Sequence, residues 1–390
     1  MGCMFSGPLQ KVHLGDTPGG GGKVFGSFSE ENGAGTSRDG NKGKNNGNGN
    51  NDTDAARQFY SFTSFILQTE IPQIFEWVFQ KEIGKGAMSR VFLSKNAETG
   101  IVCAAKVYNK GMLSRQTLGN EEPAYFAVQR EIEIMAAINH RYVLPIIEVI
   151  EDDMSNSLIM LMPYAEHGTL QSYFEHHPVT EKTLSICFFQ IAEAIRHIHS
   201  LNIVHRDIKP DNILAFSDTK FYLSDFSVST ALDSQDQKLV DTRGSPAFLS
   251  PEECGGEAFD PKPADVWAYG VSLYSLAFTK LPFNLDQGQG RTVANTIFAV
   301  TELLNKETLL FPQNHSYSPI FIELLTSILS KDASKRPTFE EIVQNQWFEE
   351  AWDIDKINII EEEERAANQP KPSTYDPDNF QNEEEENKAQ

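Results

Sequence analysis

The amino-acid sequence predicts an α+β fold in which strands come early in the chain, helices come later and polar tails close both ends. Three observations support this prediction. Segments typical of strands lie in the first half, at 82–91, 104–106, 142–150 and 157–162. An apolar stripe at helical spacing follows between Leu184 and Ile198. The two ends are rich in glycine, asparagine and acidic residues, which bury too little apolar surface to offset the entropy cost of ordering.

Shifts in composition divide the chain into four segments. Residues 1–58 are expected to form a disordered arm, since 14 of the 26 glycines lie within the first 55 residues. The aromatic-rich segment 59–76 is expected to pack as an entry to the folded domain, which spans 77–348. The last segment, 349–390, carries 14 acidic and 4 basic residues and is expected to be a solvated, disordered tail.

Charge and cysteine usage exclude several classes of protein. The net charge of −22 argues against nucleic acid as a partner. Four widely spaced cysteines form neither a disulfide framework nor a zinc site, which fits a reducing compartment. No apolar run reaches the length of a membrane span, and the N-terminus lacks the apolar core of a secretory signal. The expected location is therefore cytoplasmic.

The first six residues, M-G-C-M-F-S, match the pattern M-G-x-x-x-[S/T] for N-myristoylation at Gly2. A single myristoyl chain binds membranes only marginally, so stable anchoring needs a second signal. Cys3 is the candidate for palmitoylation, because few basic residues lie nearby. The pattern predicts a lipid anchor at the cytoplasmic face of a membrane.

The most informative string is H-R-D-I-K-P-D-N, which ends at Asn212 and is followed by D-F-S beginning at Asp225. Asp207 supplies a carboxylate that can accept the proton of an attacking hydroxyl, and Lys209 supplies a cation near a moving phosphoryl group. Asn212 and Asp225 supply the oxygen ligands that Mg²⁺ prefers. These residue types at this spacing predict phosphoryl transfer.

A glycine-rich turn and a strand lysine indicate a nucleotide site. Gly84 and Gly86 allow the backbone to approach phosphates closely. On the following strand Ala104 and Lys106 point the same way, so the alanine can face adenine while the lysine reaches the phosphates. The backbone of 162–165 can bind the adenine edge. The residues expected around ATP are Ile83, Gly84, Gly86, Val91, Ala104, Lys106, Met162, Pro163, Ala165 and Leu214.

A predicted helix at 124–138 offers a carboxylate to pair with Lys106. Glu131 is the preferred candidate, and Glu133 is the alternative. Further along, S-P-E at 250–252 closes a segment that opens at Asp225, and Arg336 is expected to pair with Glu252 inside the fold.

Together these strings resemble the eukaryotic protein kinase family over about residues 77–348. The resemblance implies a bilobal protein kinase fold, with a β-rich N-lobe to about residue 165 and a larger, mainly helical C-lobe from about 166. It also implies ATP and Mg²⁺ in the cleft and proteins as substrates. Lys209 within H-R-D-x-K-x-x-N is similar to the serine/threonine-specific pattern.

A narrower likeness is present. The strings K-V-Y-N-K at 106–110 and G-S-P-A-F-L-S-P-E at 244–252 resemble calcium/calmodulin-dependent protein kinase kinases. D-F-S-V-S at 225–229 is similar to plant kinases that activate relatives of AMP-activated protein kinase. The likeness implies that other kinases, phosphorylated on their activation loops, are substrates. Calmodulin is not an expected partner, because its targets are basic amphipathic helices and the tail is acidic.

The sequence departs from the kinase pattern at two positions: Ser89 replaces the third loop glycine, and Ser227 replaces the glycine of D-F-G. Two other functions are less consistent with the sequence. A membrane-tethered pseudokinase scaffold commonly lacks the strand lysine, the base or a metal ligand, all of which are present here. A small-molecule phosphotransferase is disfavoured by G-S-P and S-P-E, which resemble the segment that docks a protein substrate.

The predicted activation loop lacks the phosphorylatable threonine that many kinases carry three residues before Gly244. That position is Asp241, whose negative charge is expected to pair with Arg206 in place of a phosphate. The alternative is that Asp241 is a solvated loop residue, with Thr242 or Ser234 as the true switch.

Overall fold

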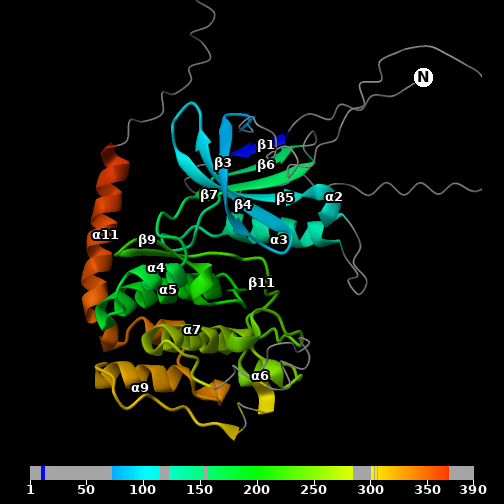
Figure 1. Cartoon of the computed structure of the whole chain (residues 1–390). Coiled ribbons are helices and arrows are strands. Elements are labelled where there is room, and N and C mark those ends of the chain that lie inside the picture. Colours follow the sequence, from blue (N-terminus) through cyan, green and yellow to red (C-terminus); the bar gives the residue numbers. More distant parts are fainter. Residues whose placement is uncertain are drawn as a thin grey trace, which may run out of the picture. The chain divides into compact units, whose positions relative to one another are not determined.

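The structure is a computed structural model that describes residues 10–13, 73–114, 123–152, 156–283, 300–302, 304 and 306–368. The chain forms two compact units (Figure 1). The first comprises Met1–Ile132 and Pro145–Tyr164, and the second comprises Glu133–Leu144 and Ala165–Gln390. Strands dominate the first unit and helices the second, as the sequence predicts.

The first unit is built on one antiparallel sheet with strand order β1-β6-β7-β5-β4-β3-β2. One face of the sheet buries aromatic and aliphatic side chains, with Phe79 and Phe92 packed edge to face at 6.4 Å. Helix α2 (Lys110–Leu113) belongs to this unit, as does helix α3 (Ala124–Ala137) as far as Ile132. The strands are β1 (Gln10–His13), β2 (Gln73–Ile74), β3 (Trp77–Lys85), β4 (Ser89–Asn96), β5 (Val102–Asn109), β6 (Glu148–Asp152) and β7 (Ser157–Pro163).

The second unit is organised around two long helices, α5 (Glu181–Ser200) and α7 (Pro261–Phe278). The predicted apolar stripe of α5 is confirmed as core, since Leu184 and Ile198 are fully buried. Shorter helices are α4 (Leu170–His176), α6 (Pro251–Cys254), α9 (Pro319–Ile328), α10 (Phe339–Ile342) and α11 (Glu349–Asn368), and 3-10 turns are η1 (Pro210–Asn212), η2 (Pro246–Phe248), η3 (Ala333–Lys335) and η4 (Gln346–Phe348). Small ribbons are formed by β8 (Ile203–Val204) with β11 (Thr230–Ala231), and by β9 (Ile213–Ser217) with β10 (Lys220–Leu223).

The prediction of a strand at 142–150 is wrong over its first part, because β6 begins only at Glu148. Tyr142 and Leu144 instead exchange backbone hydrogen bonds with Leu223, at 2.8 and 2.9 Å. These bonds satisfy the same backbone groups that a longer β6 would have used.

Parts of both tails are ordered where disorder was expected. Gln10–His13 forms the edge strand β1 against β6. Helix α11, orange to red in Figure 1, packs along α5. Ala351 is buried on this helix, and the indole of Trp352 donates to the Val343 carbonyl at 3.1 Å. The predictions for residues 1–9, which include the lipid anchor at Gly2 and Cys3, and those for 14–72 and 369–390 concern residues outside the described part of the chain.

None of the helices in the described part of the chain combines the length and apolarity needed to cross a membrane.

Candidate active site

The sheet register of the first unit lines up the predicted nucleotide residues. Gly84 pairs with Val91, and Val91 pairs with Lys106, across β3, β4 and β5. Paired residues of antiparallel strands share a face, so these three form a row. Two residues along β5, Ala104 pairs with Met162 and shares that face.

The other predicted nucleotide residues are placed less uniformly. Ile83, which is 38% exposed, lies near the end of β3, and Gly86 lies in the turn between β3 and β4. Pro163 pairs with Cys103 and therefore lies on the opposite face from Met162. Ala165 and Leu214 belong to the second unit.

Lys106 is held by a buried carboxylate from α3. Its Nζ lies 2.7 Å from Oε1 of Glu131, while the Tyr108 hydroxyl donates to Oε2 at 3.0 Å. Glu131 is buried, whereas the alternative, Glu133, is exposed. Tyr108 was not predicted from the sequence as a site residue, although its place two residues after Lys106 puts it on the same strand face. Burial raises the pKa of the Tyr108 phenol, so it remains a donor.

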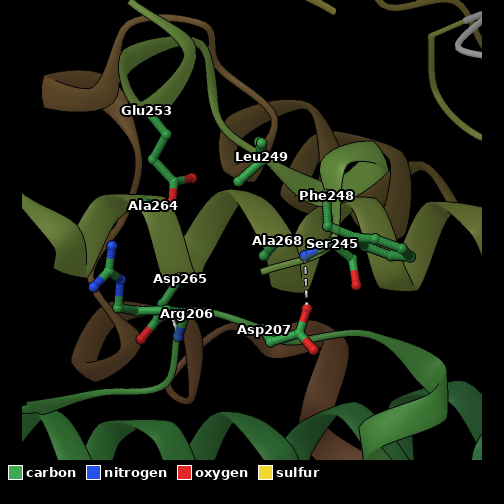
Figure 2. Close-up of a pocket in the computed structure, with 9 residues that line it drawn as sticks. All are labelled: Arg206, Asp207, Ser245, Phe248, Leu249, Glu253, Ala264, Asp265 and Ala268. Carbon is green, nitrogen blue, oxygen red and sulfur yellow. Dashed lines mark hydrogen bonds between the residues drawn. The ribbon is translucent and has the colours of Figure 1, made fainter. Parts of the chain in front are cut away.

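Three donors surround the carboxylate of Asp207 in the catalytic loop, residues 205–212. Its Oδ2 accepts hydrogen bonds from Lys209 Nζ at 2.7 Å and from Asn212 Nδ2 at 2.9 Å. Its Oδ1 accepts the backbone N–H of Ser245 at 2.9 Å (Figure 2). Lys209 Nζ also donates to Ser245 Oγ at 2.7 Å. Ser245 therefore joins the activation segment, residues 225–252, to the predicted base. This role was not predicted from the sequence.

Asp265 at the start of α7 fixes the backbone of the catalytic loop. Its carboxylate accepts the backbone N–H groups of His205 and Arg206 at 2.9 and 2.8 Å, and His199 Nε2 lies 2.8 Å away. Burial alone would raise the pKa of Asp265, but these hydrogen bonds and the nearby histidines lower it. Arg206 has φ +68°, and Asp225 has φ +62°. Such strained backbone persists only where surrounding contacts impose it.

Arg206 contacts Asp241, as expected from the sequence. Its Nη2 donates to Oδ1 and to the backbone oxygen of Asp241 at 3.1 and 2.6 Å, and Nη1 donates to Thr230 Oγ1 at 3.1 Å. Burial tends to raise the pKa of Asp241, but hydrogen bonds and charge from Arg206, with a contribution from Arg243, lower it overall. Thr242 Oγ1 donates instead to the Glu253 carbonyl at 3.0 Å.

The candidate metal ligands are an amide oxygen and a carboxylate. The Nδ2 group of Asn212 donates to the backbone oxygen of Asp207 at 2.8 Å, which turns the Asn212 amide oxygen away from the Asp207 carboxylate. With Asp225 it offers oxygen donors, a set that fits a small hard cation completed by water and phosphate oxygens. Across the described residues no three His, Cys, Asp or Glu side chains gather as a dedicated metal site.

The predicted structural ion pair is present: Arg336 contacts both carboxylate oxygens of Glu252, at 2.5 and 2.8 Å. Its guanidinium is fully buried, and it also donates to the Pro263 carbonyl at 2.8 Å.

The family model for the protein kinase domain matches residues 77–348. The chain belongs to the protein kinase family. This confirms the resemblance inferred from the catalytic strings, together with the predicted kinase fold. Protein kinase domains use ATP and a divalent metal ion and act on proteins.

Several curated relatives are named serine/threonine kinases. A Dictyostelium discoideum protein named as a probable serine/threonine-protein kinase is 33% identical over 70% of this chain and 38% of its own length. The Arabidopsis thaliana kinase GRIK1 is 29% identical over 70% of this chain and 66% of its own. The Caenorhabditis elegans calcium/calmodulin-dependent protein kinase kinase is 28% identical over 70% of this chain and 53% of its own. The match spans only 38% and 31% of two Dictyostelium relatives.

Proposed function

We propose that the chain is a Mg²⁺-dependent serine/threonine protein kinase that transfers the γ-phosphoryl group of ATP to protein hydroxyl groups. The observation that carries this proposal is the environment of Asp207. Lysine, amide and backbone donors hold both of its carboxylate oxygens, so the group is fixed in position, as a base must be.

Each residue has a definite task in this proposal. Asp207 accepts the proton of the substrate hydroxyl, and Lys209 keeps a positive charge within 2.7 Å of that carboxylate. Asn212 and Asp225 would hold Mg²⁺, which supplies charge neutralisation at the phosphates when bound. Lys106, oriented by Glu131 and Tyr108, binds phosphate oxygens. Phosphoryl transfer depends mainly on such positioning and electrostatics.

We further propose that the substrates are other protein kinases, phosphorylated on their activation loops. The narrower sequence likeness supports this, as does the similarity to the Caenorhabditis relative, which is named as a kinase kinase. The test is incubation with Mg-ATP and catalytically inactive candidate kinases, followed by phosphosite mapping. Sites within activation loops are expected, and the Lys106→Met variant serves as the inactive control. Robust activity on non-kinase proteins with no activation-loop site would refute the substrate proposal while leaving kinase activity intact.

We propose that Asp241 gives the enzyme basal activity without loop phosphorylation, because it already contacts Arg206. After phosphatase treatment, the wild type is expected to stay active. Asp241→Asn should lose about tenfold, comparable to a charge-assisted hydrogen bond. Thr242→Ala is the matched comparison, measured in the same peptide-phosphorylation assay. If phosphatase silences the wild type and Thr242→Ala is equally silent while Asp241→Asn is not, the activating role of Asp241 is disproved.

We propose a cytoplasmic protein anchored to a membrane through acyl chains on Gly2 and Cys3. Gly2→Ala is expected to move most of the protein from membranes to cytosol, because the myristoylation pattern requires glycine at this position. Cys3→Ser should do so partly, since one chain binds marginally. Fractionation of cells expressing each variant measures this, and a wild type found wholly in the soluble fraction would exclude the anchor.

A further inference from the structure

A small cavity lined by both polar and apolar residues lies where helix α6, helix α7, the catalytic loop and the activation segment meet (Figure 2). The space open to the centre of a water molecule is about 10 Å³, enough for about one water. Arg206 is the single basic residue among those that line it. The lining residues are Arg206, Asp207, Ser245, Phe248, Leu249, Glu253, Ala264, Asp265 and Ala268.

Glu253 places a carboxyl group in this cavity. The residue is only 6% exposed, and its Oε2 accepts hydrogen bonds from Ser250 N and Ser250 Oγ, both at 2.9 Å. This is the capping box of α6. Helix α10 has the same capping box, in which the Glu341 carboxylate accepts a hydrogen bond from the backbone N–H of Thr338, the N-cap residue. Glu341 is exposed, so the chain offers a matched pair of carboxylates with the same hydrogen bonds and opposite burial.

The pKa values of the two carboxyl groups are shifted in opposite directions. Hydrogen bonds from Thr338 lower the pKa of Glu341. Burial raises the pKa of Glu253 to about 7 despite its bonds to Ser250, and the charges of Asp265 and Glu252 add to the rise.

Most charged neighbours of Glu253 are already paired. Asp265 has its histidine and backbone partners, Asp207 has Lys209, and Glu252 has Arg336. Arg206 is different: its Nη atoms contact Asp241 and Thr230, but its buried Nε has no hydrogen-bond partner among the described residues. The titratable and charged groups around Glu253 are Glu252, Cys254, Asp265, Arg206 and Asp207, with Asp241, Lys209, His199, His205 and Arg336 behind them.

Helix α6 is also tied directly to the activation segment. The Thr242 hydroxyl donates to the backbone oxygen of Glu253 at 3.0 Å, and Thr242 adjoins Asp241. A change at Glu253 therefore reaches the Arg206–Asp241 contact by two routes: through the charge in the cavity and through Thr242.

We propose that Glu253 is a positioning residue that makes kinase activity depend on pH: in its neutral form it leaves Arg206 on Asp241, and in its ionised form it draws Arg206 away and loosens the activation segment. This inference rests on the proposed kinase function. Among the described residues that line the cavity, an ionised Glu253 meets no cation other than Arg206. Arg206 is the cation that can approach it, at the expense of Asp241.

The first test compares wild type, Glu253→Gln and Glu341→Gln by kcat/KM for a peptide substrate between pH 6 and 8. A group with a pKa of about 7 goes from about one-tenth to nine-tenths ionised over this range. Wild-type activity is therefore expected to fall by up to about tenfold relative to Glu253→Gln, with Glu341→Gln following the wild type. If Glu253→Gln and wild type keep a constant ratio across the range, the proposal is overturned.

The second test does not depend on activity. A carboxyl whose pKa is raised on folding binds more protons in the folded state, so stability falls as pH rises from about 4.5 to 7. The urea midpoint of wild type should therefore drop relative to that of Glu253→Gln between pH 5 and 8, and the midpoint of Glu341→Gln, which keeps Glu253, should drop in the same way. A constant gap overturns the proposal. A pH-dependent gap in a protein that shows no kinase activity at any pH would instead reject the proposed function.

A third variant covers the case in which Glu253→Gln does not fold. Asp241→Asn removes the carboxylate that competes for Arg206, so its activity, though lower, should no longer fall between pH 6 and 8. A fall as steep as that of the wild type overturns the proposal.

Discussion

Asp207→Asn is expected to lower kcat by about a thousandfold, because the substrate hydroxyl then has no carboxylate to accept its proton. The amide also places an N–H group against the donors that now surround Asp207, from Lys209, Asn212 or Ser245. One of these contacts must therefore be lost, at a cost of about 1 kcal/mol of stability. Steady-state phosphorylation of a peptide and thermal unfolding measure the two effects separately.

Asp211→Asn is the matched control for this prediction. Asp211 lies four residues further along the same loop and is exposed, so the same substitution there should leave both turnover and thermal stability near those of the wild type. Purified Asp207→Asn that retained more than about a tenth of wild-type turnover would remove Asp207 from the role of base.

Gly244→Ala is expected to lower activity by about a hundredfold and stability by about 3 kcal/mol. Gly244 has φ +93°, and a Cβ there would lie 2.2 Å from the backbone oxygen of Arg206 and 3.3 Å from Asp207 Oδ1. Neither neighbour can give way, because Asp265 holds the Arg206 backbone. The activation segment must then move, and Ser245 loses its hydrogen bond to the base.

Gly256→Ala separates this clash from the cost of the backbone conformation alone. Gly256 also has positive φ, +75°, but a Cβ there meets nothing within 4 Å. It should cost only about 1 kcal/mol and leave activity intact. Equal losses in the two variants, by chemical denaturation and peptide phosphorylation, would show that the contact with Arg206 is unimportant.

The candidate site could be predicted from sequence where chemistry demands a fixed residue type at a fixed spacing. Asp207, Lys209 and Asn212 lie within one short loop, so their spacing along the chain is nearly their spacing in space. Lys106 could be placed because strand alternation is strict. Its partner could be narrowed only to Glu131 or Glu133, and burial on α3 distinguishes the two.

Some contacts made across long separations, unlike the pair of Arg336 and Glu252, could not be predicted from the sequence. Glu253 reads as one more acidic residue after S-P-E, and only the packing of α6 against α7 makes it a buried carboxyl. The segment 142–147 has the composition of a strand. It forms backbone hydrogen bonds to Leu223, almost eighty residues away in the chain, and β6 therefore begins only at Glu148. Local propensity cannot anticipate such a competing partner.

Helix α11 has a consequence for where this kinase domain ends. The family match stops at Phe348, yet the Tyr142 hydroxyl donates to Asp355, and Asn358 Nδ2 donates to the Thr219 carbonyl at 3.3 Å. A chain that ended at Phe348 would expose the face of α5 that α11 covers, and it would leave the Tyr142 hydroxyl without the Asp355 carboxylate as acceptor. The packed domain therefore extends beyond the family match to at least Asn358, and the first part of the acidic tail belongs to it.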